Sequence, residues 1–158
     1  HGMAFTKPFM STGYVLVTQG PAKDVKSLDD AKAMGVKVGV PAYSPMSEYA
    51  EANGIPHETF FQNYQVIDAL IHGRVNAAMI WSGAVSQARL EHPEGEFEMV
   101  PGWVPPPEMR FDNNWGVKEK EVELIQFINE SFDEMLKSGE IKRISERYGV
   151  PFYPPISR

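Results

Sequence analysis

The feature of this sequence that most constrains its fold is a repeat of short apolar runs, each followed by a stretch that favours a helix. The apolar runs lie at residues 14–18, 36–40 and 76–80, and the helical stretches that follow them lie at 27–34, 45–53 and 84–91. A further helical stretch, 64–72, precedes the third run. Strand and helix alternate with short connections, which is typical of an α/β domain. We therefore expect a three-layer αβα fold on a mainly parallel open sheet, with 36–40 and 76–80 as adjacent or near-adjacent central strands.

Helix boundary signals support this pattern. Ser44 is placed to cap a helix that starts at Pro45, and Gly54 follows its end. The pattern changes after residue 120, where the spacing predicts a long amphipathic helix over 121–137 and a last helix over 140–148. The apolar stripe of the long helix comprises Val122, Ile125, Ile128, Phe132, Met135 and Leu136.

Composition excludes several classes of function. Fifteen Lys and Arg residues stand against twenty-one Asp and Glu, and no basic run follows the pattern of a nucleic-acid surface. The chain has no cysteine, and its four histidines do not fall at metal-ligand spacing, so we expect no metal and no cofactor. No apolar stretch is long enough to cross a bilayer, so we expect no membrane insertion. His1-Gly2 looks like a tag remnant.

Four segments of the chain, in order, resemble the type II periplasmic solute-binding proteins. They are FTKPFMSTGYVLVTQG, VKSLDDAKAMGVKVGV, IDALIHGRVNAAMI and EMLKSGEIKRISERYGV. The resemblance implies one lobe of a two-lobed binding protein, with the first lobe absent from this sequence. Residues 1–12 would then be the tag remnant and outgoing hinge segment, 13–116 the second solute-binding lobe, and 117–158 the helices and tail that return to the first lobe. It also implies a periplasmic location.

A finer resemblance is to the solute-binding-like accessory proteins encoded with quinoprotein methanol dehydrogenases. It rests on AAMIWSGAVSQA, PPPEMRFDNNWGV and RYGVPFYPP. Amino-acid-binding members of the wider family usually carry an aspartate after the strand matched by 76–80, where it holds the ligand ammonium. This chain has Trp81-Ser82 there. The departure argues against a zwitterionic α-amino acid as ligand.

The first candidate binding segment is the loop that opens the helix at 45–53. Free backbone N–H groups at a helix start favour an anion, and hydroxyl groups nearby add hydrogen bonds. The candidate residues are Tyr43, Ser44, Met46 and Ser47. The competing interpretation is that Ser44 only caps the helix and Tyr43 only packs on the surface.

The second candidate segment lies at the end of the strand at 76–80. Trp81, with Ser82 beside it, could form an apolar or stacking wall, because ligands bind beyond the carboxyl ends of strands in open α/β sheets. Trp81 could equally be a packing residue. Asn63 and Tyr64, at the start of the next helix, could face the same cleft or serve as cap residues. We expect Trp81 and the loop at 43–47 to approach one another.

Three functions remain open. The first is solute binding between two lobes that close by a hinge, for an ABC-type transporter or another partner. The second is an accessory or interaction protein of a dehydrogenase that uses pyrroloquinoline quinone, with Trp81, Trp103 and Trp115 as partner contacts. The third is a dehydratase or sensor-domain relative. No serine or histidine has the context of a catalytic triad, so we expect no catalytic residue and no enzyme activity. Without its first lobe, the chain is expected to self-associate or form a domain-swapped dimer.

Overall fold

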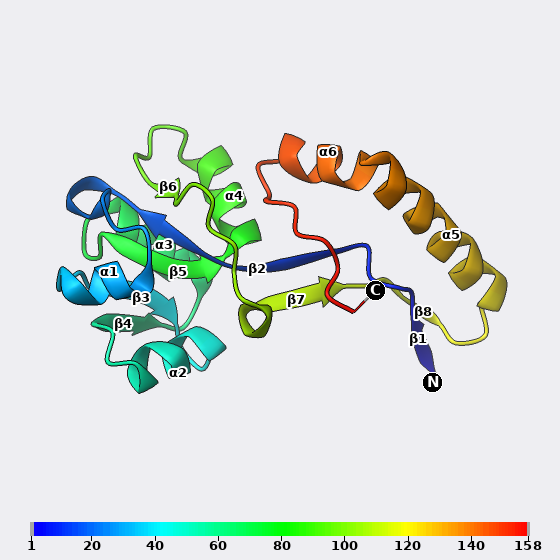
Figure 1. Cartoon of the computed structure of the whole chain (residues 1–158), viewed down its shortest axis with the longest axis horizontal. Helices are drawn as coiled ribbons and strands as arrows, with labels where there is room; N and C mark the ends of the chain where they lie inside the picture. Colours follow the sequence, from blue (N-terminus) through cyan, green and yellow to red (C-terminus); the bar gives the residue numbers. More distant parts are fainter. Residues whose placement is uncertain (1, 158) are drawn as a thin grey trace. The chain divides into compact units, whose positions relative to one another are not determined.

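The computed structural model describes residues 2–157, in two compact units (Figure 1). One unit is Gly13–Met109, and the other joins the segment that ends at Thr12 to the chain from Arg110 onward. His1, half of the predicted tag remnant, lies outside the described residues. None of the helices in the described residues has the length and apolar character needed to cross a membrane.

The unit Gly13–Met109 is built on a sheet in which the predicted central strands are neighbours. The sheet order is β4-β3-β5-β2-β6, with β3 at Val38–Pro41, β4 at His57–Phe60 and β5 at Ala77–Trp81. Val38 is in register with His57 on one side and with Ala77 on the other, and both pairings are parallel. The expected pairing of 36–40 with 76–80 is confirmed.

The sheet is mixed, whereas the sequence predicted a mainly parallel one. β2 (Met10–Thr18) runs antiparallel to β5 and to β6 (Glu98–Met99). The register sets Tyr14, near the start of this strand, opposite Trp81, which ends β5. The chain therefore enters this unit at the edge where β3, β4 and β5 end, and β2 must run against them. After β2 the chain passes through η1 (Gly20–Ala22) and α1 (Leu28–Ala33) to β3. β3 does not pair with β2, because β5 lies between these two strands.

Helices cover both faces of the sheet, as expected for a three-layer αβα fold (Figure 1). α1 and α2 (Pro45–Ala52) pack on one face, where Leu16, Val40 and Met79 are buried. α3 (Asn63–Ile71) and α4 (Ser82–Glu91) pack on the other, over Val17 and Ile80. Alternate residues of β2 and β5 thus enter opposite cores, as the twofold periodicity of a strand requires.

The start of α2 confirms the predicted cap. The backbone N–H of Ser47 donates to Ser44 Oγ at 3.3 Å, and the backbone N–H of Ser44 donates to Ser47 Oγ at 3.2 Å. This reciprocal pair is a capping box, which satisfies two backbone donors at a helix start.

The second unit combines three short strands with two helices. β1 (Met3–Phe5) pairs antiparallel with β8 (Gly116–Lys118), and β7 (Arg110–Asn113) pairs with β2. α5 (Val122–Ser138) and α6 (Glu140–Arg147) fall within one residue of their predicted ranges. η2 (Pro107–Met109) ends the first unit just before β7.

Part of the apolar stripe of α5 is buried within its own unit. Ile128 and Phe132 are buried with Met10, and the Phe132 ring lies 4.9 Å from that of Phe9 and 5.3 Å from that of Trp115. Val122, at the start of the same stripe, is exposed. The predicted apolar stripe is therefore buried at Ile128 and Phe132 and exposed at its start.

Candidate functional site

The carboxyl ends of three parallel strands meet at one edge of the unit Gly13–Met109. Pro41, the last residue of β3, is in register with Phe60, the last residue of β4. The pairing of β3 with β5, continued by the same step, brings Trp81 level with the residue after Pro41. Each strand leads directly into the start of a helix: α2, α3 and α4. Ligands bind at this edge in open α/β sheets.

Four exposed aromatic side chains follow these strand ends, and we call this set the aromatic edge. Their exposed fractions are 90% for Tyr43, 73% for Phe61, 69% for Tyr64 and 42% for Trp81. The rings of Tyr43 and Phe61 lie 6.2 Å apart at 40°. Exposed aromatic clusters are uncommon unless they contact a ligand or a partner.

Phe61 belongs to this set although the sequence analysis did not select it. A Phe-Phe pair before a helix start is typical of a strand end, where an apolar residue is expected to be buried. The strand ends one residue earlier, at Phe60, which is buried. The signal that could have identified Phe61 is the Phe-Phe pair itself, since only one of two successive strand residues can face a given core.

The four candidates in and after the loop that follows β3 differ in their exposure and in the contacts they make. Ser44 and Ser47 are engaged in the capping box, and Ser44 Oγ also donates to the carbonyl of Pro41 at 2.6 Å. Met46 is completely buried in the core, so it offers no surface to a ligand, contrary to the prediction. The reason is its place one turn inside α2, on the face toward the sheet. Only Tyr43 projects freely from this loop.

Tyr43 has an unusual backbone conformation. Its φ is 53°, in the left-handed region, and it is the one non-glycine residue with positive φ among residues 2–157. A non-glycine residue there costs about 1 kcal/mol or more, and such strain is concentrated at functional sites. A glycine would relieve it, so the fold alone gives no reason for a tyrosine at this position.

The start of α3 resolves the alternatives for Asn63 and Tyr64. Gln62 precedes the helix, and its backbone N–H donates to the Gln65 side chain at 3.1 Å, so Asn63 is not the cap residue. The Asn63 Oδ1 atom is buried and has no hydrogen-bond partner among the described residues. Tyr64 is exposed in the first turn.

Trp81 and Ser82 occupy the end of β5 and the start of α4. A Cβ placed on Gly83 would collide with the Trp81 ring, so the indole lies directly over this glycine. Within residues 2–157 the ring of Tyr43 lies against that of Phe61, and the approach of Trp81 to the loop at 43–47 stays a prediction. Ser82 is fully buried, and its hydroxyl has no hydrogen-bond partner within the described part of the chain.

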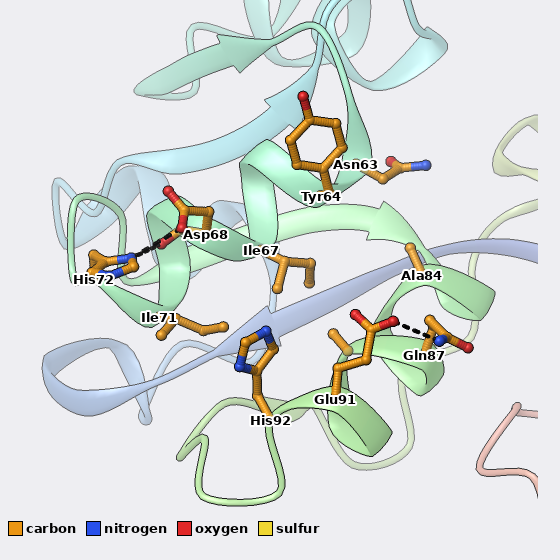
Figure 2. A pocket seen from close by; sticks show the side chains of 11 residues that line it. Asn63, Tyr64, Ile67, Asp68, Ile71, His72, Ala84, Gln87, Glu91 and His92 are labelled. Carbon is orange, nitrogen blue, oxygen red and sulfur yellow. Dashed lines mark hydrogen bonds and ion pairs between the residues drawn. The ribbon is translucent and has the colours of Figure 1, made fainter.

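A groove between α3 and α4 also reaches this edge (Figure 2). Its volume is about 400 Å³, and Ile67, Ile71 and Ala88 line its apolar part. The polar groups along it already pair with one another: His72 with Asp68 at 3.2 Å, and Gln87 with Glu91 at 2.7 Å. Asn63 and Tyr64 lie at one end of the groove (Figure 2). Asn63 Oδ1 is a buried polar atom at this groove that has no hydrogen-bond partner among the described residues.

Comparison with known proteins identifies the fold. No protein-family model and no curated protein sequence matches the chain. Solved structures do match, and those described below are solute-binding or substrate-binding proteins and domains of the type II periplasmic class. The chain therefore has the α/β fold of these domains, as the sequence resemblance predicted.

Three of these structures show the extent of the likeness. The L-cystine solute receptor of Neisseria gonorrhoeae is 22% identical, with a TM-score of 0.73 over 99% of this chain and 62% of that one. Substrate-binding domain 2 of Lactococcus lactis GlnP is 20% identical, with a TM-score of 0.73 over 92% and 62%. The periplasmic binding protein XoxJ from Methylobacterium extorquens AM1 is 21% identical, with a TM-score of 0.72 over 95% and 72%. The chain spans about three fifths of the length of the first two.

Proposed function

We propose that this chain is part of an extracytoplasmic solute-binding protein and that the aromatic edge is its half of a ligand site. The observation that carries the proposal is the position of Tyr43, Phe61, Tyr64 and Trp81 at the carboxyl edge of the sheet, where this fold binds solutes. The rest of the site would come from a further lobe, which closes on the ligand by a hinge. Delivery to an ABC-type transporter and a periplasmic location are part of the proposal.

The chain path supports a two-lobe arrangement. The unit Gly13–Met109 is continuous in sequence, whereas the other unit is made of the two segments that flank it. A lobe inserted into another lobe has this pattern. We propose that Gly13–Met109 is the complete second lobe and that α5 and α6 belong to the first. The change from unit to unit falls at Met109, before the end at residue 116 that the sequence suggested.

An accessory role beside a dehydrogenase is the second candidate. It is favoured by the match to XoxJ, of which the chain covers a larger share than of the L-cystine solute receptor or of GlnP substrate-binding domain 2. A protein partner would use exposed tryptophans, and both Trp81 and Trp115 are exposed. Trp103 fits such a role less well, because its indole N–H donates to the carbonyl of Tyr14 at 3.1 Å and the ring packs on both cores.

An enzymatic role has little support at this edge. A dehydratase on this fold would need an acid in the cleft, and the end of β5 holds Trp81. We therefore propose binding without catalysis.

The test is native mass spectrometry of the protein purified from its own host, to detect a small molecule or a dehydrogenase that stays bound. Trp81→Ala should lose the bound species, with a loss of affinity of about 1 to 3 kcal/mol. Leu90→Ala removes another exposed apolar side chain, on α4, and should retain it. Equal retention by both variants would contradict the proposed site.

The same Trp81→Ala protein should remain folded. A buried tryptophan truncated to alanine costs roughly 3 to 5 kcal/mol of stability, but Trp81 is 42% exposed and should cost less. A large loss of thermal stability with unchanged binding would assign the residue to packing and not to recognition.

A further inference from the structure

The chain segments that carry the aromatic edge contain no charged residue. Residues 41–47, 61–67 and 81–87 follow the three strand ends, and none of them is Asp, Glu, Lys, Arg or His, although 23% of the whole chain is charged. Tyr14, opposite Trp81, is uncharged as well at neutral pH. These segments therefore offer no counter-ion to an ammonium or a guanidinium. Asp68 and His72 line hollows with Tyr64 and Phe61, but they already pair with one another at 3.2 Å.

The side chains that do project from the edge offer ring faces. Tyr43, Phe61 and Tyr64 are each more exposed than buried, and the Trp81 ring lies over Gly83. Aromatic faces bind other rings and the apolar faces of sugars by stacking and apolar contact. The strained backbone at Tyr43 adds to this argument, because the fold keeps a ring at a position where glycine would be less costly.

Two unsatisfied polar atoms lie among these rings. Ser82 Oγ, in a fully buried residue at the start of α4, and Asn63 Oδ1, at the start of α3, have no hydrogen-bond partner within residues 2–157. A buried polar group without a partner is unfavourable, and each such group in a folded protein requires an explanation. Ser82 is completely buried, whereas Asn63 is partly exposed, so the Asn63 amide is the group that a hydroxyl or N–H of a ligand would pair with.

We propose that the aromatic edge binds an uncharged ring, aromatic or sugar-like, by stacking on Tyr43, Phe61 and Trp81, with the Asn63 amide available to its polar groups. This inference rests on the proposed function and specifies its ligand class. The proposed ligand differs from that of the ancestral arginine-binding protein, whose bound arginine carries several charges. Binding by this chain alone should be weak, with Kd in the region of 1 mM, because it supplies one half of the contacts.

The experiment is a titration of the ¹⁵N-labelled protein followed by NMR. The neutral ring probes are indole and methyl β-D-glucopyranoside, and the charged acyclic probes are L-arginine and L-glutamine. At least one ring probe should shift the amide signals of Tyr43, Phe61 and Ser82, while the charged probes should leave them in place. A response to indole alone identifies an aromatic ligand, and a response to the glucoside alone identifies a sugar.

Two variants make the result specific. Tyr43→Gly removes the ring and relieves the backbone strain, so it should weaken binding of the ring probe about tenfold without unfolding the protein. Tyr148→Ala removes an exposed aromatic ring from the other unit and should leave binding unchanged.

Each remaining outcome overturns the inference in a distinct way. Shifts caused only by arginine or glutamine would reject the ring ligand but retain a solute site at this edge. Shifts that persist in Tyr43→Gly, or the absence of shifts with every probe, would reject the ring ligand and leave the proposed function to the native mass spectrometry described above.

Discussion

Tyr14 lies directly opposite Trp81 in the antiparallel pairing of β2 with β5, and its hydroxyl is hydrogen-bonded to the Ser44 side chain. One side chain of β2 therefore connects the end of β5 with the loop that precedes α2. Partial burial raises the pKa of the Tyr14 phenol, while the hydrogen bond with Ser44 acts in the opposite direction. Tyr14 thus links two of the strand ends that carry the aromatic edge. From the sequence alone, Tyr14 could be placed only at the start of a strand.

The raised pKa of Tyr14 predicts a loss of stability in alkali. A phenol with a higher pKa in the folded than in the unfolded protein stabilises the fold fully below the unfolded value, near 10, and this stabilisation is lost as the pH rises through the folded value. Tyr14→Phe should therefore show a weaker decline in unfolding free energy above pH 10 than the parent. Urea denaturation from pH 7 to 11 measures this. Tyr153, whose pKa is also raised by burial, remains in both proteins and provides a common background.

The positive φ of Tyr43 predicts an order of stability for two substitutions. Tyr43→Gly and Tyr43→Ala both remove the ring, but only glycine adopts φ of 53° without strain. We expect the glycine variant to be more stable than the alanine variant by about 1 kcal/mol in urea denaturation. An alanine variant as stable as the glycine variant would show that the loop relaxes to another conformation.

The contact between Gly83 and Trp81 predicts an energetic coupling. Gly83→Ala adds a methyl group that improves helix propensity by up to about 1 kcal/mol, but that group collides with the indole. The substitution should therefore stabilise the Trp81→Ala protein more than it stabilises the parent. A double-mutant cycle in urea measures the coupling, and additive free energies would place the indole away from Gly83 in solution.

Local signals in the sequence predicted most of the elements. Ser44 with Ser47 specified the start of α2, and the apolar spacing specified α5 and α6 to within a residue. These features depend on neighbours a few positions apart in the chain. The direction of β2 could not be predicted in this way, because it depends on where the chain enters the unit. That depends on contacts between residues as distant as Tyr14 and Trp81.

The candidate site could likewise be predicted only in part, because local patterns give positions along the chain but not tertiary contacts. Placing binding residues after strand ends led to Tyr43 and Trp81, since the position of a loop follows from the strand pattern. The exposure of a side chain is set by its tertiary neighbours, so the sequence could not show that the candidate Met46 is buried or that Phe61 is exposed. The sequence also left Asn63 open as a cap, whereas Gln62 precedes α3 and pairs with Gln65.

The Asp112 carboxylate predicts an acid-sensitive C-terminal tail. It accepts the backbone N–H of Ile156 at 2.8 Å and that of Ser157 at 2.9 Å. Burial acts to raise the pKa of this carboxyl, but the hydrogen bonds from Ser157 and Ile156, helped by Arg110, together hold it below its ordinary value. Stability from such a group is present above the unfolded pKa, near 3.9, and is lost as the pH falls through the folded value.

Hydrogen-exchange protection at Ile156 and Ser157 tests this. In the parent it should hold at pH 6 and fall below about pH 4, whereas Asp112→Asn should show reduced protection throughout. Asp133→Asn is the control, because Asp133 lies on α5, where it pairs with Lys7 at 3.3 Å. Full protection in Asp112→Asn at neutral pH would show that other contacts hold the tail.

The exposed apolar residues of the second unit predict self-association. Ile128 and Phe132 are covered, but Leu124 and Phe127 on α5 and Phe5 on β1 remain exposed. Leu124 and Phe127 are three residues apart, so they share one side of the helix. In the proposed two-lobed protein they belong to the first lobe, and without its remainder a second copy of the chain can cover them.

The sedimentation coefficient should therefore rise with protein concentration. Phe127→Asp should reduce that rise, whereas Leu90→Asp, on the other unit, should not. A sedimentation coefficient that stays at the monomer value at the highest concentrations would contradict the prediction.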